Sequence, residues 1–218
     1  MSRILPCDPA RPAVDIIEAA VEVLDNGGVV VMPTETQYSL SIRADRPEAM
    51  ATIGRLKGRE SSVKPALFVR DLSLAEQFCL LNTVARALGE RYLPGPMTLV
   101  VPARPGQRVV ADGFVSEHGI GVRISSSPVV AAVMNRVPFA VTATSANRSG
   151  EMTPSTAAEI ARLFGDEVDL YLDGGPCRGV VPSTVVKVDG GVTILRPGQI
   201  AEAEIRRFIE KERRDGRL

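Results

Sequence analysis

The sequence predicts an α/β fold, a single domain with a twisted, mixed β-sheet flanked by helices. Short apolar runs rich in β-branched residues alternate along the chain with stretches whose apolar residues recur at helical spacing. The chain of 218 residues is long enough to bury a core without disulfides or metal. No internal repeat or linker divides it, so we expect one domain over residues 10–200 and a charged C-terminal helix or tail over residues 201–218.

Amphipathic spacing predicts a first helix over residues 14–24, ended by Asn26 and the two glycines after it. Asp45 is expected to cap a second helix, with Glu48 three residues later completing a capping box. Further helical segments are predicted over residues 71–78, 83–92, 128–135, 156–164 and 201–214.

Apolar, β-branched runs bounded by Pro, Gly or polar residues predict the strands. They cover residues 29–32, 38–42, 66–69, 97–101, 121–124, 139–141, 170–172, 183–188 and 192–195. Asp189-Gly190-Gly191 joins the last two as a hairpin, and residues 103–118 are predicted as a loop with a short helix.

Composition excludes several classes of protein. The 26 basic and 26 acidic residues cancel, so the chain does not have the charge of a protein that wraps nucleic acid. Three widely spaced cysteines form neither a disulfide framework nor a zinc signature, which indicates a reducing compartment. No 18-residue apolar run and no signal core are present, so we expect a soluble, cytoplasmic protein without a membrane span.

Common catalytic and phosphate-binding patterns are also missing. The chain has one histidine, His118, and its neighbours do not mark it as a catalytic base. Neither a GxxxxGK[ST] loop nor a GxGxxG turn occurs. Bound phosphate would therefore depend on scattered cations and hydroxyls, and no metal site is predicted in the protein itself.

The stretch from Pro138 to Gly150, PFAVTATSANRSG, begins as a buried strand and ends in small polar residues. Ligands dock at the carboxyl ends of strands in open α/β sheets, and small side chains let backbone N–H groups approach an anion. Ser145 and Asn147 would then face a ligand. An ordinary strand followed by a Ser/Asn/Gly turn fits the same residues, and both interpretations stay open.

Four cations, Arg55, Lys57, Arg59 and Lys64, gather around the end of the second helix with only Glu60 against them. They can simply complement the helix dipole. Outside a helix, however, the Lys-x-Arg spacing lets two cations reach one polyphosphate.

Arg123 and Arg196 each stand at the end of an apolar strand, and Ser183 stands at the start of another. An ordinary salt bridge could accommodate either arginine. Taken with the two preceding clusters, these residues suggest a concave site for an anionic ligand without an obvious nucleophile. Catalysis there would depend on positioning and on charge stabilisation, as in phosphoryl or nucleotidyl transfer.

A series of motifs in fixed order resembles the YrdC-like threonylcarbamoyl-AMP synthases. The motifs are PTETQYSL, LKGR, KPALFV, LPGPMTLV, GVRI, TSANRSG, PSTVV and LRPG, and the match runs from about the first helix to Gly198. The resemblance implies a twisted α/β sheet with a large positively charged cavity. It also implies a nucleotidyltransferase that makes threonylcarbamoyl-AMP and pyrophosphate from L-threonine, bicarbonate and ATP, for threonylcarbamoyladenosine modification of tRNA.

The resemblance implies site residues position by position. Lys57, Arg59, Ser145 and Asn147 match the catalytic and ATP-binding elements. Lys64, Thr153 and Arg196 match further ATP-side positions, and Thr34, Arg123 and Ser183 match threonine-side positions. Mg²⁺ is expected to arrive with ATP, and the product is expected to pass to the tRNA threonylcarbamoyl transferase machinery.

The chain also departs from the family pattern. Gln37 and Ser39 replace an apolar residue and a glycine, and Val69 stands near the place of a common histidine, which bears on strictness for threonine. A related branch of the family lacks the Lys-x-Arg and Ser-x-Asn elements, whereas this chain keeps both. The length of this chain resembles the short form of the family, which is expected to lack an added C-terminal domain.

Two alternative functions remain open at this point. The chain could be an RNA-binding or ribosome-associated protein that uses the same basic concavity, although aromatic residues for base stacking are scarce at 4%. It could also carbamoyl-adenylate another amine. Weak RNA binding is compatible with either activity, and the sequence does not distinguish a monomer from a homodimer.

Overall fold

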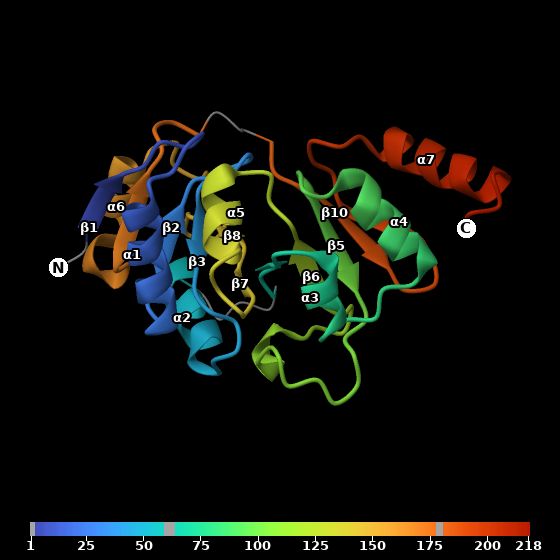
Figure 1. Ribbon diagram of the computed structural model, residues 1–218, viewed down its shortest axis with the longest axis horizontal. Coiled ribbons are helices and arrows are strands. Elements are labelled where there is room, and N and C mark those ends of the chain that lie inside the picture. Colours follow the sequence, from blue (N-terminus) through green and yellow to red (C-terminus); the bar gives the residue numbers. More distant parts are fainter. Residues whose placement is uncertain (1–2, 59–63, 178–180) are drawn as a thin grey trace.

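A computed structural model describes residues 3–58, 64–177 and 181–218. Two sheets stand side by side in it, with helices packed on their outer faces (Figure 1). The α/β fold with mixed strand pairing is confirmed, although the strands are hydrogen-bonded as two sheets where the sequence indicated one. Within the described residues, no helix is long and apolar enough to cross a membrane.

The first sheet has five strands in the order β1-β9-β2-β3-β8. Their bounds are Arg3–Pro6, Leu170–Asp173, Val30–Met32, Ser39–Ser41 and Thr144–Ser145, in that order. β1, β9 and β2 pair in parallel, whereas β3 is antiparallel to both of its neighbours. β1 had no counterpart among the predicted strands, because a four-residue segment ending in proline carries almost no periodic signal.

The second sheet has six strands in the order β11-β10-β5-β6-β4-β7. Their bounds are Val192–Arg196, Thr184–Val188, Met97–Val101, Ile120–Arg123, Leu67–Phe68 and Val141–Thr142, in that order. β10 and β11 form the expected antiparallel hairpin, and β10 pairs in parallel with β5. Arg123 thus ends β6, an inner strand, and Arg196 ends β11, one of the two edge strands.

The chain passes from one sheet to the other at Ala143. On one side of it, β7 pairs with β4, so that Val141 lies opposite Phe68. On the other side, β8 pairs with β3, so that Ser145 lies opposite Ser39. The Ala143 N–H donates to Ala66 O at 2.7 Å. Of the strand predicted at 139–141, only Val141 lies in a strand, and residues 141–142 and 144–145 form two short strands that are bonded to different sheets.

Helices cover both sheets. Their bounds are Val14–Asp25 for α1, Glu48–Lys57 for α2, Leu72–Glu76 for α3, Thr83–Tyr92 for α4, Pro128–Met134 for α5, Ala157–Phe164 for α6 and Glu202–Arg214 for α7. The described residues also include two 3-10 turns, Asp112–Phe114 and Gly165–Glu167. α1 and α5 bury one apolar cluster against β2 and β9, and a larger cluster fills the rest of the molecule.

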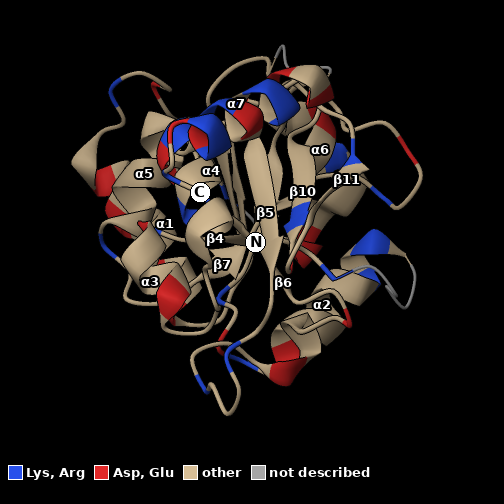
Figure 2. Ribbon diagram, turned by 90° about the vertical axis from the view of Figure 1, so that its right-hand side faces the viewer, with Lys and Arg blue, Asp and Glu red and all other residues tan. Residues whose placement is uncertain are grey.

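The C-terminal helix α7 lies on the second sheet's side of the molecule. Basic and acidic residues alternate along it (Figure 2). Ile205 and Ile209 are buried in the larger core, which anchors this helix by its apolar stripe.

The capping prediction for α2 is wrong. Pro47 occupies the N-cap, and no side chain bonds the first turn. Asp45 instead accepts two hydrogen bonds from Arg43, both 2.6 Å long. A two-pronged ion pair with a guanidinium competes effectively with a cap, and the sequence pattern alone does not reveal that competitor. Real caps occur at Asp71, Asn82 and Thr156.

Gly198 packs directly on the start of β10. A Cβ at this position would lie 2.3 Å from Thr184 N and 2.4 Å from the carbonyl carbon of Ser183. We therefore expect Gly198→Ala to lower the free energy of unfolding by about 1–3 kcal/mol, because backbone must move to admit the methyl group. Chemical denaturation monitored by circular dichroism measures the change.

Gly191→Ala is the matched control for this substitution. A Cβ at Gly191 would meet nothing within 4 Å, so its unfolding free energy should stay close to that of the wild type. Equal stability of the two variants would contradict the close approach at Gly198.

Candidate functional site

A cavity of about 840 Å³ lies between the two sheets, and most of the predicted site residues line it. β3, β8 and α2 contribute from one side, and β4, β5, β6, β10 and β11 from the other. The predicted residues that line it are Thr34, Lys57, Lys64, Arg123, Ser145, Asn147, Ser183 and Arg196. Thr153 is not among the lining residues, and Arg59 lies outside the part of the chain that the structure describes.

The loop after β8 is tied to the last residue of α2. Lys57 Nζ donates to Ser145 O at 2.7 Å, to Asn147 Oδ1 at 2.7 Å and to Asn147 O at 3.0 Å. The Ser149 N–H donates in turn to Lys57 O at 3.0 Å. These acceptors around the ammonium are neutral oxygens. The Lys and Ser-x-Asn elements therefore form one unit at the cavity wall, although they lie about 90 residues apart.

α2 ends at Lys57, the residue whose side chain bonds the loop after β8. Gly58 adopts a left-handed conformation with φ of 71° and closes the helix after Lys57. The lysine side chain can then extend across to the loop after β8. The sequence suggested both interpretations of the basic cluster, helix-dipole stabilisation and ligand binding, and the placement of Lys57 in the cavity wall is consistent with either.

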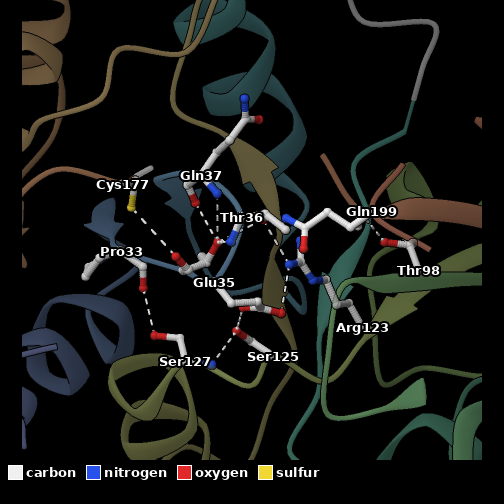
Figure 3. Close-up of polar contacts among 12 residues, drawn as sticks. Pro33, Glu35, Thr36, Gln37, Thr98, Arg123, Ser125, Ser127, Cys177 and Gln199 are labelled. Atoms are coloured by element: carbon white, nitrogen blue, oxygen red, sulfur yellow. Dashed lines mark hydrogen bonds and ion pairs between the residues drawn. The ribbon is translucent and has the colours of Figure 1, made fainter. Parts of the chain in front are cut away.

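Arg123 leaves the end of β6 and is paired deep in the cavity. Its Nη2 donates to Glu35 Oε1 at 2.8 Å and to the Thr36 hydroxyl at 2.9 Å (Figure 3). The residue is only 6% exposed, and its Nε is buried without a hydrogen-bond partner. An orphaned buried donor is costly, so a ligand oxygen at this edge of the guanidinium would be favoured.

Glu35 was not among the predicted site residues. It comes from the polar loop after β2, and Ser125 donates to its other oxygen, Oε2, in a short hydrogen bond. Burial raises the pKa of the Glu35 carboxyl, but the Arg123 charge and the hydrogen bonds from Ser125 and Arg123 outweigh burial and bring this pKa below its ordinary value. The acid in the PTET run was the available signal, but a lone acid in a loop does not reveal its partner.

The hydroxyl of Thr34 shapes the loop that carries Glu35. It donates to Gln37 O at 2.6 Å and accepts the N–H groups of Thr36 and Gln37, each at 3.1 Å. Its only proton is used inside this turn. The two N–H groups also use both lone pairs of the hydroxyl oxygen, so the Thr34 side chain could bind a ligand only by giving up a bond of this turn.

Arg196 lies near Arg123 but is held differently. Its Nη2 donates to Ser183 O at 2.9 Å and to Ser183 Oγ at 3.2 Å, and Ser183 Oγ contacts the Thr98 hydroxyl at 3.0 Å. Burial, followed by the charge of Arg123, lowers the pKa of Arg196. Among the described residues Arg196 has no acidic partner. Two guanidinium groups that repel each other favour an anion between them.

Of the three residues that depart from the family pattern, two line the cavity and one does not. Gln37 and Ser39 line the cavity, and Ser39 Oγ contacts Ser41 Oγ at 3.2 Å. Val69 is buried at 1% exposure outside the lining, while its neighbour Phe68 lines the cavity under Arg123 at 5.8 Å. Ser39 is thus a buried lining residue at a position where the family pattern has glycine.

His118 lies in a tight turn at the edge of the cavity. Its side chain is 48% exposed and contacts Glu117, at 3.6 Å between Nε2 and Oε1. Across the described residues, no three or more His, Cys, Asp or Glu side chains are grouped to hold a metal ion. Each carboxylate oxygen of Glu35 accepts one hydrogen bond, Oε1 from Arg123 and Oε2 from Ser125.

The sequence of this chain is similar to a family model and to known proteins. A family model named Sua5/YciO/YrdC, described as "Telomere recombination", matches residues 22–198. A putative threonylcarbamoyl-AMP synthase of Methanocaldococcus jannaschii is 32% identical over 186 residues, which cover 85% of this chain and 86% of that protein.

Solved structures agree with the fold. The crystal structure of Pyrococcus abyssi Sua5 complexed with L-threonine superposes with a TM-score of 0.87 at 28% identity, covering 95% of this chain and 61% of that one. The crystal structure of Escherichia coli YciO gives a TM-score of 0.84 at 27% identity, covering 94% of this chain and 100% of that one.

The ionised form of Glu35 should stabilise the folded protein. Because its folded-state pKa is lowered, this contribution is present above the unfolded pKa of about 4.3 and is lost as pH falls through the folded pKa. The difference in unfolding free energy between wild type and Glu35→Gln should therefore shrink on acidification below that value. Urea denaturation across pH 3–7 measures it, and a difference that grows in acid would contradict the pairing.

Proposed function

This chain belongs to the Sua5/YciO/YrdC family, and we propose that it is a threonylcarbamoyl-AMP synthase. In this reaction L-threonine, bicarbonate and ATP give threonylcarbamoyl-AMP and pyrophosphate. The observation that carries the proposal is the convergence of Lys57, Ser145, Asn147, Arg123 and Arg196 on one cavity. The name of the Methanocaldococcus relative and the threonine bound to the Pyrococcus protein support the same substrates.

The nucleotide half of the proposal rests on Lys57, Ser145 and Asn147. A lysine ammonium held by fixed oxygens at the cavity wall is preorganised to stabilise charge that develops on phosphate. Arg196 adds a second fixed cation, and Lys64 lines the same space. Arg59 and Thr153 keep their roles as predictions from the family resemblance. Mg²⁺ would arrive on the phosphates, since the described residues offer it no acidic cluster.

The amino-acid half rests on Arg123 and Ser183. The unpaired Nε of Arg123 is a donor suited to a carboxylate oxygen, and Ser183 links this end of the cavity to Arg196. A threonine held by its carboxylate could direct its amine toward the phosphate end. Ser39 and Gln37 in the lining would then influence how strictly the side chain is selected.

The chemistry requires positioning more than a protein nucleophile. The threonine nitrogen forms a bond to the bicarbonate carbon, and water leaves to give a carbamate. A carbamate oxygen then bonds to the α-phosphorus while the bond from that phosphorus to the bridging oxygen of pyrophosphate breaks. The protein supplies fixed positive charge and orientation for this displacement.

The product would serve threonylcarbamoyladenosine formation in tRNA, through a transferase machinery that uses it in the cytoplasm. No specific observation favours the RNA-binding alternative over the enzyme. Direct contact with RNA and the choice between monomer and homodimer stay predictions from the sequence.

Lys57→Ala should lower threonine-dependent pyrophosphate release by about 100-fold, because one preorganised charge at the phosphates is lost. Pyrophosphate is measured with ATP, L-threonine and bicarbonate, and each is omitted in turn. Lys187→Ala is the matched control, because Lys187 pairs with Asp189 and does not line the cavity. Wild-type protein that releases no threonine-dependent pyrophosphate, beside an active family enzyme, would refute the proposed function.

A further inference from the structure

We propose that Glu35 is a positioning residue for the amino acid: it fixes the guanidinium of Arg123 so that its unpaired edge receives the substrate carboxylate. The inference rests on the proposed function and deepens it by assigning the residue that sets affinity for the amino acid. Glu35 does not touch the reacting atoms. It positions Arg123 through one ion pair, and it is itself held by one hydrogen bond from Ser125.

The partners of Arg123 determine which way its guanidinium faces. Glu35 and Thr36 both bind the same nitrogen, Nη2. Nη1 and Nε make no hydrogen bond within the described residues, and Nε is buried. A single anchored nitrogen leaves the rest of the rigid fork available for a carboxylate, at one fixed angle.

Glu35 is itself held from two further directions (Figure 3). Ser125 Oγ donates to Oε2 and accepts the Ser127 N–H at 3.1 Å. Ser127 Oγ donates to Pro33 O at 2.9 Å, which joins the start of α5 to the loop that carries Glu35. This chain of bonds links the loop after β2, the end of β6 and the start of α5. The carboxylate therefore cannot follow Arg123 if the arginine swings.

Charge gives Glu35 a second effect on affinity. An isolated buried guanidinium would be expensive, and the Glu35 pair offsets that cost before any ligand arrives. A carboxylate ligand then competes with no other anion for Nε and Nη1. The opposite mechanism is that Glu35 blocks Arg123 and must be displaced, and it predicts the opposite change in affinity when the charge is removed.

The test compares Glu35→Gln with wild type by steady-state pyrophosphate release, varying L-threonine and ATP separately. We expect the KM for threonine to rise about tenfold, since a displacement on the order of 1 Å in a positioning group is costly. The KM for ATP should stay within about twofold and kcat within about threefold. A lower KM for threonine would show that Glu35 blocks the site, and an unchanged KM would show that it is irrelevant; either result overturns the inference.

Glu117→Gln is the matched control. It removes one negative charge from the lining of the same cavity by the same chemical change, but Glu117 is 85% exposed and, among the described residues, forms an ion pair with His118 alone. Its KM for threonine should match wild type. A tenfold rise in this variant as well would assign the effect to net charge and overturn the positioning role.

Ser125→Ala tests the brace while keeping the Glu35 charge, and it covers the case in which Glu35→Gln does not fold. We expect a rise of about threefold in the KM for threonine, because one hydrogen bond to a charged group is lost. Ser126→Ala, at the exposed neighbouring serine, should leave both KM values unchanged. Equal effects on threonine and ATP in Ser125→Ala would indicate general structural damage and contradict the inference.

These assays distinguish failure of the proposed synthase function from failure of the positioning role of Glu35. Wild-type protein without threonine-dependent turnover refutes the proposed function, and the inference with it. Active wild-type protein whose Glu35→Gln and Ser125→Ala variants keep the wild-type KM for threonine refutes the inference alone.

Discussion

The site depends on a single crossing of the backbone between two sheets. Val141 and Thr142 hydrogen-bond to β4, whereas Thr144 and Ser145 hydrogen-bond to β3, with Ala143 between them. The cavity is lined by residues of both sheets, and Ala143, Thr144 and Ser145 are among them. The crossing therefore places the polar end of this segment in the cavity wall.

A hollow of this size must be lined so that the polar groups around it remain satisfied without a ligand. The lining achieves this by pairing distant segments, Lys57 with the loop after β8, Arg123 with Glu35, and Arg196 with Ser183. Within the described residues, Arg123 Nε is the one buried side-chain nitrogen or oxygen left without a partner. A ligand oxygen that accepts from this nitrogen would bind favourably, because folding has already removed the nitrogen from water.

The order of elements was predictable because their patterns are local. Residues 14–24, 83–92 and 97–101 carry helical or strand periodicity that needs no tertiary partner. They correspond to α1, which extends one residue further, and to α4 and β5, whose bounds are as predicted. The Asp45 cap failed because Arg43 competes for the carboxylate, and the competitor is recognisable only in three dimensions.

The split of the sheet and the role of Glu35 could not be predicted for the same reason. Which strand bonds residues 141–145 is a matter of long-range pairing that short apolar runs do not encode. Glu35 precedes Arg123 by 88 positions, and nothing in either local sequence indicates the other. Lys57, Ser145 and Asn147, which the family resemblance grouped, are hydrogen-bonded to one another in the structure, and their roles stay predictions.

The two arginines of the cavity differ in what neutralises them, and this difference suits the two substrates of the proposed reaction. Arg123 shares its charge with Glu35, so its surroundings are close to neutral and match an amino acid, which carries no net charge itself. Arg196 is held by the neutral oxygens of Ser183 and keeps its full charge, which matches a polyphosphate. Burial, followed by the charge of Arg123, lowers the pKa of Arg196. In the proposed reaction, one acidic side chain placed at only one of two cations would thus be enough to divide a single cavity into an amino-acid end and a phosphate end.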